Sequence, residues 1–246
     1  MSGNIAVTRQ RHRFAPVPHR ENAAKEDGIM KLKGIVFDMD GTLCEPQNYM
    51  FGQMREAVGI PKESDILDYI HGLTDSEQEV AFSKIKAIES EAMAKQVPQA
   101  GLVTLMEYLD QHGIQKGICT RNFDTPVAHL LSTHVPGHID AFAPVITREF
   151  RPPKPSPAGI LHIAHAWGIT DTATVPDSPP GDRPLPLVMV GDSIDDIAAG
   201  YDAGALTVLL RSEGKEDLEE DERTDVVISR LDELIGLLQN GLTMRR

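Results

Sequence analysis

The chain has 246 residues, of which 41% are hydrophobic and 25% are charged, enough to bury a sizeable core in one or two domains. Its 24 lysines and arginines against 37 aspartates and glutamates give a net charge of −13. This balance disfavours a nucleic-acid partner and an anionic membrane surface. No run reaches the roughly 20 apolar residues that a membrane span needs.

The N-terminal segment differs in composition from the rest of the chain. Residues 1–20 contain Arg9, Arg11, Arg13 and Arg20 but no acid, and they lack the apolar core of a signal peptide. We expect residues 1–29 to be a disordered tail that catalysis does not need. We expect a cytoplasmic protein, with a mitochondrial transit peptide as the alternative.

Two short apolar runs end abruptly at carboxylates. Residues 34–37 end at Asp38 and residues 187–190 are followed by Gly-Asp192, a pattern typical of buried strands in a parallel sheet. Carboxylates just after such strands lie where open α/β sheets bind ligands. We therefore expect Asp38 and Asp192 to converge, with Asp40 pointing to the same side as Asp38.

Between these runs, residues 44–98 have a helical pattern. Thr74 and Glu77 have the spacing of a capping box. Behind them, apolar residues recur at helical spacing, which predicts a buried stripe: Ala81, Ile85, Ile88 and Ala92.

Strands and helices then alternate, which is typical of a doubly wound parallel sheet in an α/β fold. The expected strands are 33–37, 115–119, 144–146, 187–190, 206–210 and 226–228. The expected helices are 102–111, 124–133, 158–167, 194–203 and 231–239. The proline-rich residues 170–186 predict a mobile surface loop, and the acidic run 213–222 is interpreted as solvated.

Four islands in this pattern resemble the four signature motifs of the haloacid dehalogenase-like superfamily, most of whose members are magnesium-dependent phosphotransferases. The islands are Asp38-Met39-Asp40-Gly41-Thr42-Leu43, Thr120 after a strand, Lys154 in a proline-rich turn, and Gly191-Asp192-Ser193-Ile194-Asp195-Asp196. The resemblance covers residues 33–240 and points to the phosphoglycolate phosphatase and β-phosphoglucomutase-like branch. It implies a Rossmann-like core at 30–43 and 99–240, a small helical cap at 44–98 and a C-terminal tail at 241–246.

The resemblance also implies a role for each motif residue. Asp38 would be the nucleophile and a metal ligand, and Asp40 would be the general acid/base with its backbone carbonyl on the metal. Asp192 would be the third protein ligand of Mg²⁺, whose preference is for oxygen donors. Asp196 would lie behind the ligands and orient them.

The other two motifs would bind the substrate. Thr120 would donate its hydroxyl to the transferred phosphate, and Lys154 would place a positive charge beside it. The resemblance therefore implies a Mg²⁺-dependent phosphatase that hydrolyses a small phosphomonoester through an aspartyl-phosphate on Asp38. The second carboxylate, Asp40, favours phosphoryl transfer over carbon–halogen cleavage.

Several alternatives remain open at the level of sequence. A phosphomutase of the same superfamily would use the same motifs, and a regulatory or binding protein could retain the frame without activity. Ser193 in a Gly-Asp-Ser-Ile block also resembles the nucleophile of Gly-Asp-Ser-Leu serine esterases, although their block lies near the N-terminus. Cys44 and Cys119 are interpreted as small apolar residues of a reduced protein.

The charge of the expected cap indicates which kind of substrate the protein can bind. Residues 44–98 contain ten acids and five bases, a net charge of −5. An acidic lid disfavours long polyanions. We therefore expect a small phosphorylated metabolite as the partner, with no nucleic acid and no membrane; the sequence does not indicate an oligomeric state.

Overall fold

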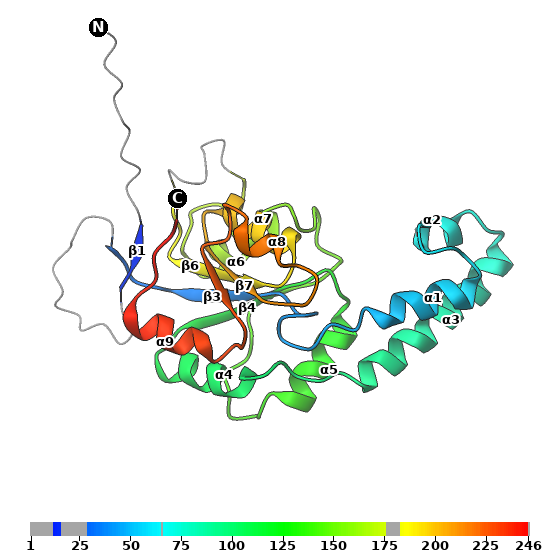
Figure 1. The fold of residues 1–246 in the computed structure, drawn as a ribbon, viewed down its shortest axis with the longest axis horizontal. Helices are drawn as coiled ribbons and strands as arrows, with labels where there is room; N and C mark the ends of the chain where they lie inside the picture. Colours follow the sequence, from blue (N-terminus) through cyan, green and yellow to red (C-terminus); the bar gives the residue numbers. More distant parts are fainter. Residues whose placement is uncertain (1–11, 16–28, 65, 176–182, 246) are drawn as a thin grey trace, which may run out of the picture.

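The computed structural model describes residues 12–15, 29–64, 66–175 and 183–245 (Figure 1). Within these residues a six-stranded, all-parallel sheet has the order β5-β4-β3-β6-β7-β8. The strands are β3 (Gly34–Phe37), β4 (Gln115–Cys119), β5 (Val145–Ile146), β6 (Leu187–Gly191), β7 (Leu206–Leu210) and β8 (Val226–Ile228). The expected doubly wound parallel sheet is confirmed.

Helices cover both faces of this sheet because successive side chains of each buried strand point to opposite faces. Ile35 and Phe37 of β3 belong to one apolar cluster, which includes side chains of α4, α5 and α9, whereas Val36 belongs to the cluster formed with α6 and α7. The helices are α4 (Leu102–Gln111), α5 (Asp124–His134), α6 (Ala158–Ala166), α7 (Ile194–Ala203) and α9 (Glu233–Asn240).

The strand order places a topological switch between β3 and β6. From β3 the chain builds outward through β4 and β5, then returns to β6 on the other side of β3 and continues to β7 and β8. Phe37 pairs with Val190, so the two central strands end level with each other. At such a switch the carboxyl ends of the strands leave a crevice for ligands.

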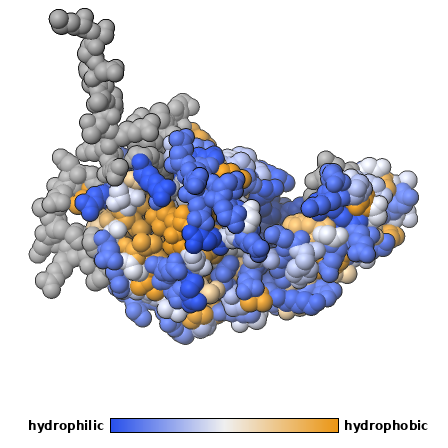
Figure 2. Space-filling view, in the orientation of Figure 1, coloured by the Kyte–Doolittle hydropathy of each residue, from blue (hydrophilic) through white to orange (hydrophobic). Residues whose placement is uncertain are grey.

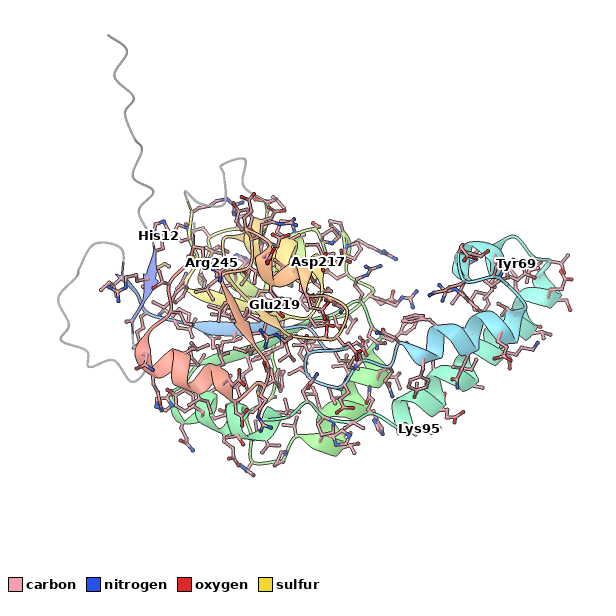
Figure 3. All side chains as sticks on the ribbon, in the orientation of Figure 1. His12, Tyr69, Lys95, Asp217, Glu219 and Arg245 are labelled. Carbon is pink, nitrogen blue, oxygen red and sulfur yellow. The ribbon has the colours of Figure 1, made fainter. Side chains whose placement is uncertain are left out.

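A helical extension projects from this edge of the sheet (Figure 1). It consists of α1 (Tyr49–Val58), α2 (Ile66–His71) and α3 (Asp75–Ala94), and Tyr69 lies near its far end (Figure 3). Buried Met54, Ile70 and Ile85 form an apolar cluster of the extension's own. The extension therefore has a small core separate from that of the sheet.

Two features of the extension agree with the sequence pattern. The Glu77 carboxylate accepts hydrogen bonds from the N–H (3.0 Å) and the hydroxyl (2.7 Å) of Thr74, as the capping-box spacing predicts. Of the predicted stripe, Ala81, Ile85 and Ala92 are buried and Ile88 is partly buried.

The stem of the extension consists of two chain segments that pair with each other. The N–H of Glu45 donates to the Val97 carbonyl (2.8 Å), and the N–H of Gln99 donates to the Leu43 carbonyl (3.0 Å). The chain therefore leaves and re-enters the core at one place.

The structure of the two chain ends differs from the prediction that they are tails. Strand β1 (Arg13–Phe14) pairs in parallel with β2 (Ile29–Met30), and the N–H of Phe14 donates to the Leu242 carbonyl (2.7 Å). Phe14 is 3% exposed and Met244 is fully buried, both within the main apolar cluster.

The tail prediction is therefore wrong for residues 12–15 and for Ile29, since β1 and β2 pair with each other. The C-terminal tail prediction is wrong for residues 242–244, because the apolar side chains of the two ends pack together. Residues 1–11 and 16–28 lie outside the described residues.

The acidic run also differs from the expectation. Within 213–222 a short helix, α8 (Asp217–Glu220), buries Leu218, so the run is not solvated throughout. Residues 176–182 of the predicted proline-rich loop lie outside the described residues. No helix in the described part of the chain is long and apolar enough to cross a membrane.

The burial of Phe14 generates a test of the terminal packing. Phe14→Ala should lower the free energy of unfolding by about 3 kcal/mol in urea denaturation, because it leaves a cavity in the main core. Arg13→Ala, at the exposed position of the same strand, is the control and should change it by less than about 0.5 kcal/mol. Equal, small effects of both substitutions would show that the N-terminal strand does not contribute to the core.

Candidate active site

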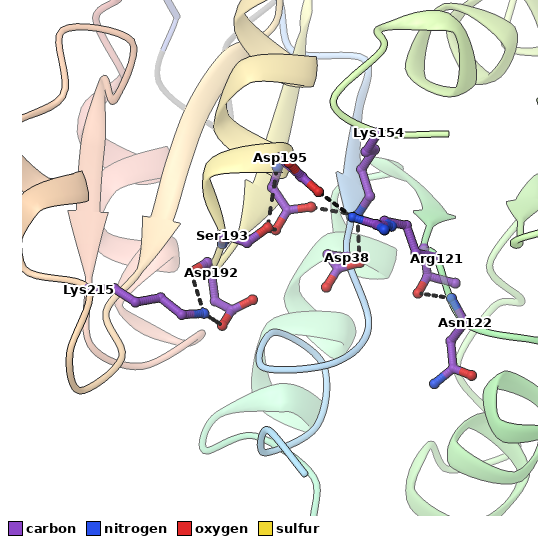
Figure 4. A network of polar contacts seen from close by, with 10 residues as sticks. Asp38, Arg121, Asn122, Lys154, Asp192, Ser193, Asp195 and Lys215 are labelled. Carbon is purple, nitrogen blue, oxygen red and sulfur yellow. Dashed lines mark hydrogen bonds and ion pairs between the residues drawn. The ribbon is translucent and has the colours of Figure 1, made fainter. Parts of the chain in front are cut away.

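Three buried carboxylates meet at the carboxyl edge of the sheet (Figure 4). Asp38 follows β3, Asp192 follows β6, and Asp196 lies in the first turn of α7. One oxygen atom from each lies within 4.8 Å of the others. The strand ends thus bring together Asp38 and Asp192 as the sequence predicts, and Asp196 joins them.

Lys154 lies between two of these carboxylates. Its Nζ donates to Oδ1 of Asp38 (2.6 Å) and to Oδ1 of Asp196 (2.5 Å), and its side chain is 3% exposed. Burial alone would lower the pKa of Lys154, but Asp196 and Asp38 together raise it well above its usual range. The lysine therefore stays charged and partly neutralises the cluster.

Burial dominates the electrostatics of the carboxylates. It raises the pKa of Asp38 to about 7, although Lys154 opposes the shift, and it also raises the pKa of Asp192. Bringing these groups together in the charged state therefore requires positive charge nearby.

The start of α7 holds Asp196 in place. Oδ2 of Asp196 accepts hydrogen bonds from the N–H (3.1 Å) and the hydroxyl (2.6 Å) of Ser193, in a capping box. Ser193 is thus the N-cap of this helix, and in the described network no histidine contacts it. This arrangement does not support the serine-esterase alternative.

Two glycines make room for the cluster. Gly41 has φ +82°, and a Cβ there would collide with the Asp192 carboxylate. A Cβ at Gly191 would collide with Asp196 in the same way. The backbone is therefore shaped around the carboxylates.

Lys215 is a contact of the cluster that the sequence did not reveal. Its Nζ donates to the Asp192 carbonyl (3.0 Å) and forms a short ion pair with the Asp192 carboxylate. In sequence Lys215 stands inside the acidic run, where nothing distinguishes it from a solvated lysine.

The Asp40 carboxylate is not one of the three that meet, but besides burial its charge contributes to the raised pKa of Asp38. Oδ2 of Asp40 accepts a hydrogen bond from Nδ2 of Asn122 (2.8 Å), and burial raises the pKa of Asp40. Thr120, at the end of β4, is buried, and its hydroxyl oxygen accepts the N–H of Asn122 (3.0 Å). Asn122 thus links the two predicted residues, a role that its sequence position gave no signal for.

A cavity of about 450 Å³ opens beside Asp40. Its walls come from α1 and α3 of the extension and from core loops that follow β4 and β5, and the surface is hollowed between these two parts (Figure 2). The residues that line it include Asp40 and Asn122, which hydrogen-bond to each other, and Phe82, Lys86 and Arg148. A substrate could therefore lie between the extension and the core.

The carboxylate cluster fits a divalent cation. Oxygen ligands from Asp38, Asp192 and Asp196 are close enough to share one ion, and the glycine positions keep space beside them clear. Carboxylate oxygens in such a group suit Mg²⁺. Both oxygens of Asp196 already accept hydrogen bonds, which favours an orienting role for that residue.

Comparison with known proteins gives a consistent result. The family model of haloacid dehalogenase-like hydrolases matches residues 32–204. An uncharacterized hydrolase of Saccharomyces cerevisiae is 44% identical over 217 residues, covering 87% of this chain and 94% of the relative. The N-acetylmuramic acid 6-phosphate phosphatase of Pseudomonas aeruginosa is 26% identical over 237 residues, covering 87% and 97%.

The fold is also similar to that of a solved structure. The crystal structure of a predicted phosphoglycolate phosphatase from Haemophilus somnus superimposes with a TM-score of 0.64 at 19% identity, covering 85% of this chain and 98% of that one.

The position of Lys154 generates a stability test. Lys154→Met should lower the free energy of unfolding by about 3 kcal/mol in chelator, because it leaves two buried carboxylates without their shared cation. Arg121→Met is the control: Arg121 is 63% exposed and pairs with Asp195 at 2.5 Å, so its loss should cost less than about 1 kcal/mol. Urea denaturation of both variants is the measurement, and comparable losses would contradict the bridging role of Lys154.

Proposed function

The chain belongs to the haloacid dehalogenase-like hydrolase family, and on that premise we propose that this enzyme hydrolyses a small phosphomonoester through a phosphorylated Asp38. The proposal rests mainly on the different surroundings of two carboxylates that are only two residues apart in the sequence. Asp38 lies in the buried cluster with Lys154, whereas Asp40 hydrogen-bonds to Asn122 and lines the cavity. This difference supports Asp38 as the nucleophile and Asp40 as the acid and base beside the substrate.

In the first half-reaction a carboxylate oxygen of Asp38 attacks phosphorus. The bond between phosphorus and the ester oxygen breaks, and Asp40 donates a proton to the departing alcohol. Burial raises the pKa of Asp40, which favours the protonated form that this step needs.

In the second half-reaction water attacks the phosphorus of the aspartyl-phosphate. Asp40 now accepts the proton of the water, the bond between phosphorus and the Asp38 oxygen breaks, and the free carboxylate is restored. Inorganic phosphate leaves. Two easier steps thus replace one difficult hydrolysis.

The phosphate oxygens are held by Lys154, which contacts Asp38, and by Thr120, which follows the strand next to β3. The Lys154 ammonium lies 2.6 Å from Asp38, so a phosphoryl group on that carboxylate meets a fixed positive charge. The Thr120 hydroxyl accepts the N–H of Asn122, which leaves its own proton to donate to a phosphate oxygen. Such fixed charge and positioning supply most of the catalysis in phosphoryl transfer.

Mg²⁺ is the proposed cofactor. Asp38, Asp192 and the backbone carbonyl of Asp40 would hold it, and Asp196 would orient these ligands through its contacts with Lys154 and Ser193. When bound, the ion neutralises the carboxylates and withdraws charge from the phosphoryl oxygens.

The proposed substrate is a small phosphorylated metabolite. Its support is the size of the cavity, about 450 Å³, and its location between the core and the extension. The net negative charge of residues 44–98 acts against long polyanions such as nucleic acid.

The nucleophile is tested by an isosteric substitution. Asp38→Asn should retain the far-UV circular dichroism of the folded protein but reduce hydrolysis of a generic aryl phosphate at least about a thousandfold, because an amide does not attack phosphorus. Asp195→Asn is the matched control, since Asp195 pairs with Arg121 outside the cluster. Substantial turnover by pure Asp38→Asn protein would refute the mechanism.

The metal is tested by removal and by a readout independent of turnover. Chelation should abolish hydrolysis and Mg²⁺ should restore it, whereas the larger, loosely coordinated Ca²⁺ should inhibit. Mg²⁺ should also raise the thermal midpoint of the native protein but not of Asp192→Asn, because binding to the folded state alone stabilises it. Full activity after exhaustive chelation would exclude a metal requirement.

A further inference from the structure

The cavity beside Asp40 has walls of mixed character. Apolar atoms supply most of its exposed lining, through side chains such as Phe82 of the extension and Phe123 of the core. Polar residues line it too, but the side-chain amides of Gln47, Gln96 and Asn122 already donate to other groups of the protein. A polyhydroxylated substrate would need many polar partners in such a site, because a buried hydroxyl without a hydrogen bond is costly. The walls therefore favour a substrate whose body is largely apolar.

Arg148 is the strongest donor on these walls. Its guanidinium carbon lies 4.0 Å from the centre of the Phe123 ring, an arrangement that keeps the planar group stacked. Its backbone N–H donates to the Asn122 carbonyl (2.9 Å), so the residue is fixed next to the loop that holds Asp40. Among the described residues no side chain forms an ion pair or hydrogen bond with the guanidinium.

The charges of the cavity are distributed unequally. Four charged side chains line it, and one of them, Asp40, is assigned to the reacting end. The remaining three are Lys86, Glu89 and Arg148. Burial raises the pKa of Glu89, and the nearby positive charge of Arg148 offsets part of this rise. Glu89 and Arg148 nevertheless form no ion pair within the described structure. Two cations against one acid give these three side chains a net positive charge.

We propose that the substrate carries a carboxylate in addition to its phosphate, joined to it by an apolar body, and that Arg148 binds this carboxylate. The inference rests on the proposed phosphatase function and specifies its substrate class. A guanidinium presents parallel N–H groups that match the two oxygens of a carboxylate. A single negative charge also matches the net single positive charge of Lys86, Glu89 and Arg148, whereas a second phosphate would not.

The experiment compares matched substrates on the purified full-length protein with Mg²⁺. One series is ω-carboxyalkyl phosphates with three to six carbons, and the other is alkyl phosphates of equal length. The native protein should prefer the carboxylate of the best-fitting length at least about tenfold in kcat/KM, mainly through KM. Arg148→Gln should reduce this preference to less than about twofold, and Arg148→Lys should restore part of it.

Arg151→Gln is the control variant. Arg151 is an exposed arginine three residues further on and does not line the cavity, so its substitution should leave the preference as in the native protein. A native preference below twofold at every chain length would overturn the inference, as would an equal loss of preference in both glutamine variants. A stronger preference for bisphosphates would overturn it as well.

Loss of the phosphatase function and loss of the carboxylate site give different results. Hydrolysis of alkyl phosphates without a carboxylate preference retains the phosphatase and removes only the inference. If neither series is hydrolysed, the proposed function fails, and calorimetry with ω-carboxyalkyl and alkyl phosphonates decides the role of Arg148. Tighter binding of the carboxylated phosphonate that Arg148→Gln abolishes would support the carboxylate site, and equal binding of both ligands would exclude it.

Discussion

The rest of the site depends on one buried ion-pair arrangement, in which Lys154 bridges Asp38 and Asp196. Moving such charges out of water costs several kcal/mol for each ion, and only close contact with good geometry repays it. The end of β3, the first turn of α7 and the turn after β5 must therefore meet at one point. The parallel strand order, the switch between β3 and β6 and the glycines beside the carboxylates all serve this convergence.

Chemistry and recognition are divided between the two parts of the molecule. The core supplies buried charged groups held by several hydrogen bonds, as Asp196 is by Ser193 and Lys154. The extension supplies mostly apolar walls and forms its own small core. Arg148 belongs to the core but faces the extension across the cavity, and it thereby connects the two tasks.

The sequence predicts the parts of the fold and site that follow from short-range pattern. Asp38 and Asp192 each follow an apolar run, and in a parallel sheet such ends lie at one edge, so their meeting was foreseeable. The roles of Asn122, Lys215 and Phe14 were not foreseeable, because each depends on a partner far away in the chain: Asp40, Asp192 and Leu242 respectively. Lys215 stands among acids and reaches Asp192 only through the course of the loop after β7. Phe14 is part of a two-residue strand whose partners include Leu242, at the other end of the chain.

The paired stem of the extension has a consequence for divergence within the family. Because residues on either side of it hydrogen-bond to each other, through Glu45 with Val97 and Leu43 with Gln99, the insertion is closed at its base before any helix begins. Its length and sequence can then change without shifting the register of β3 or the position of Asp38. One helical insertion can therefore be replaced by another during evolution. The substrate range then changes while the catalytic residues keep their positions.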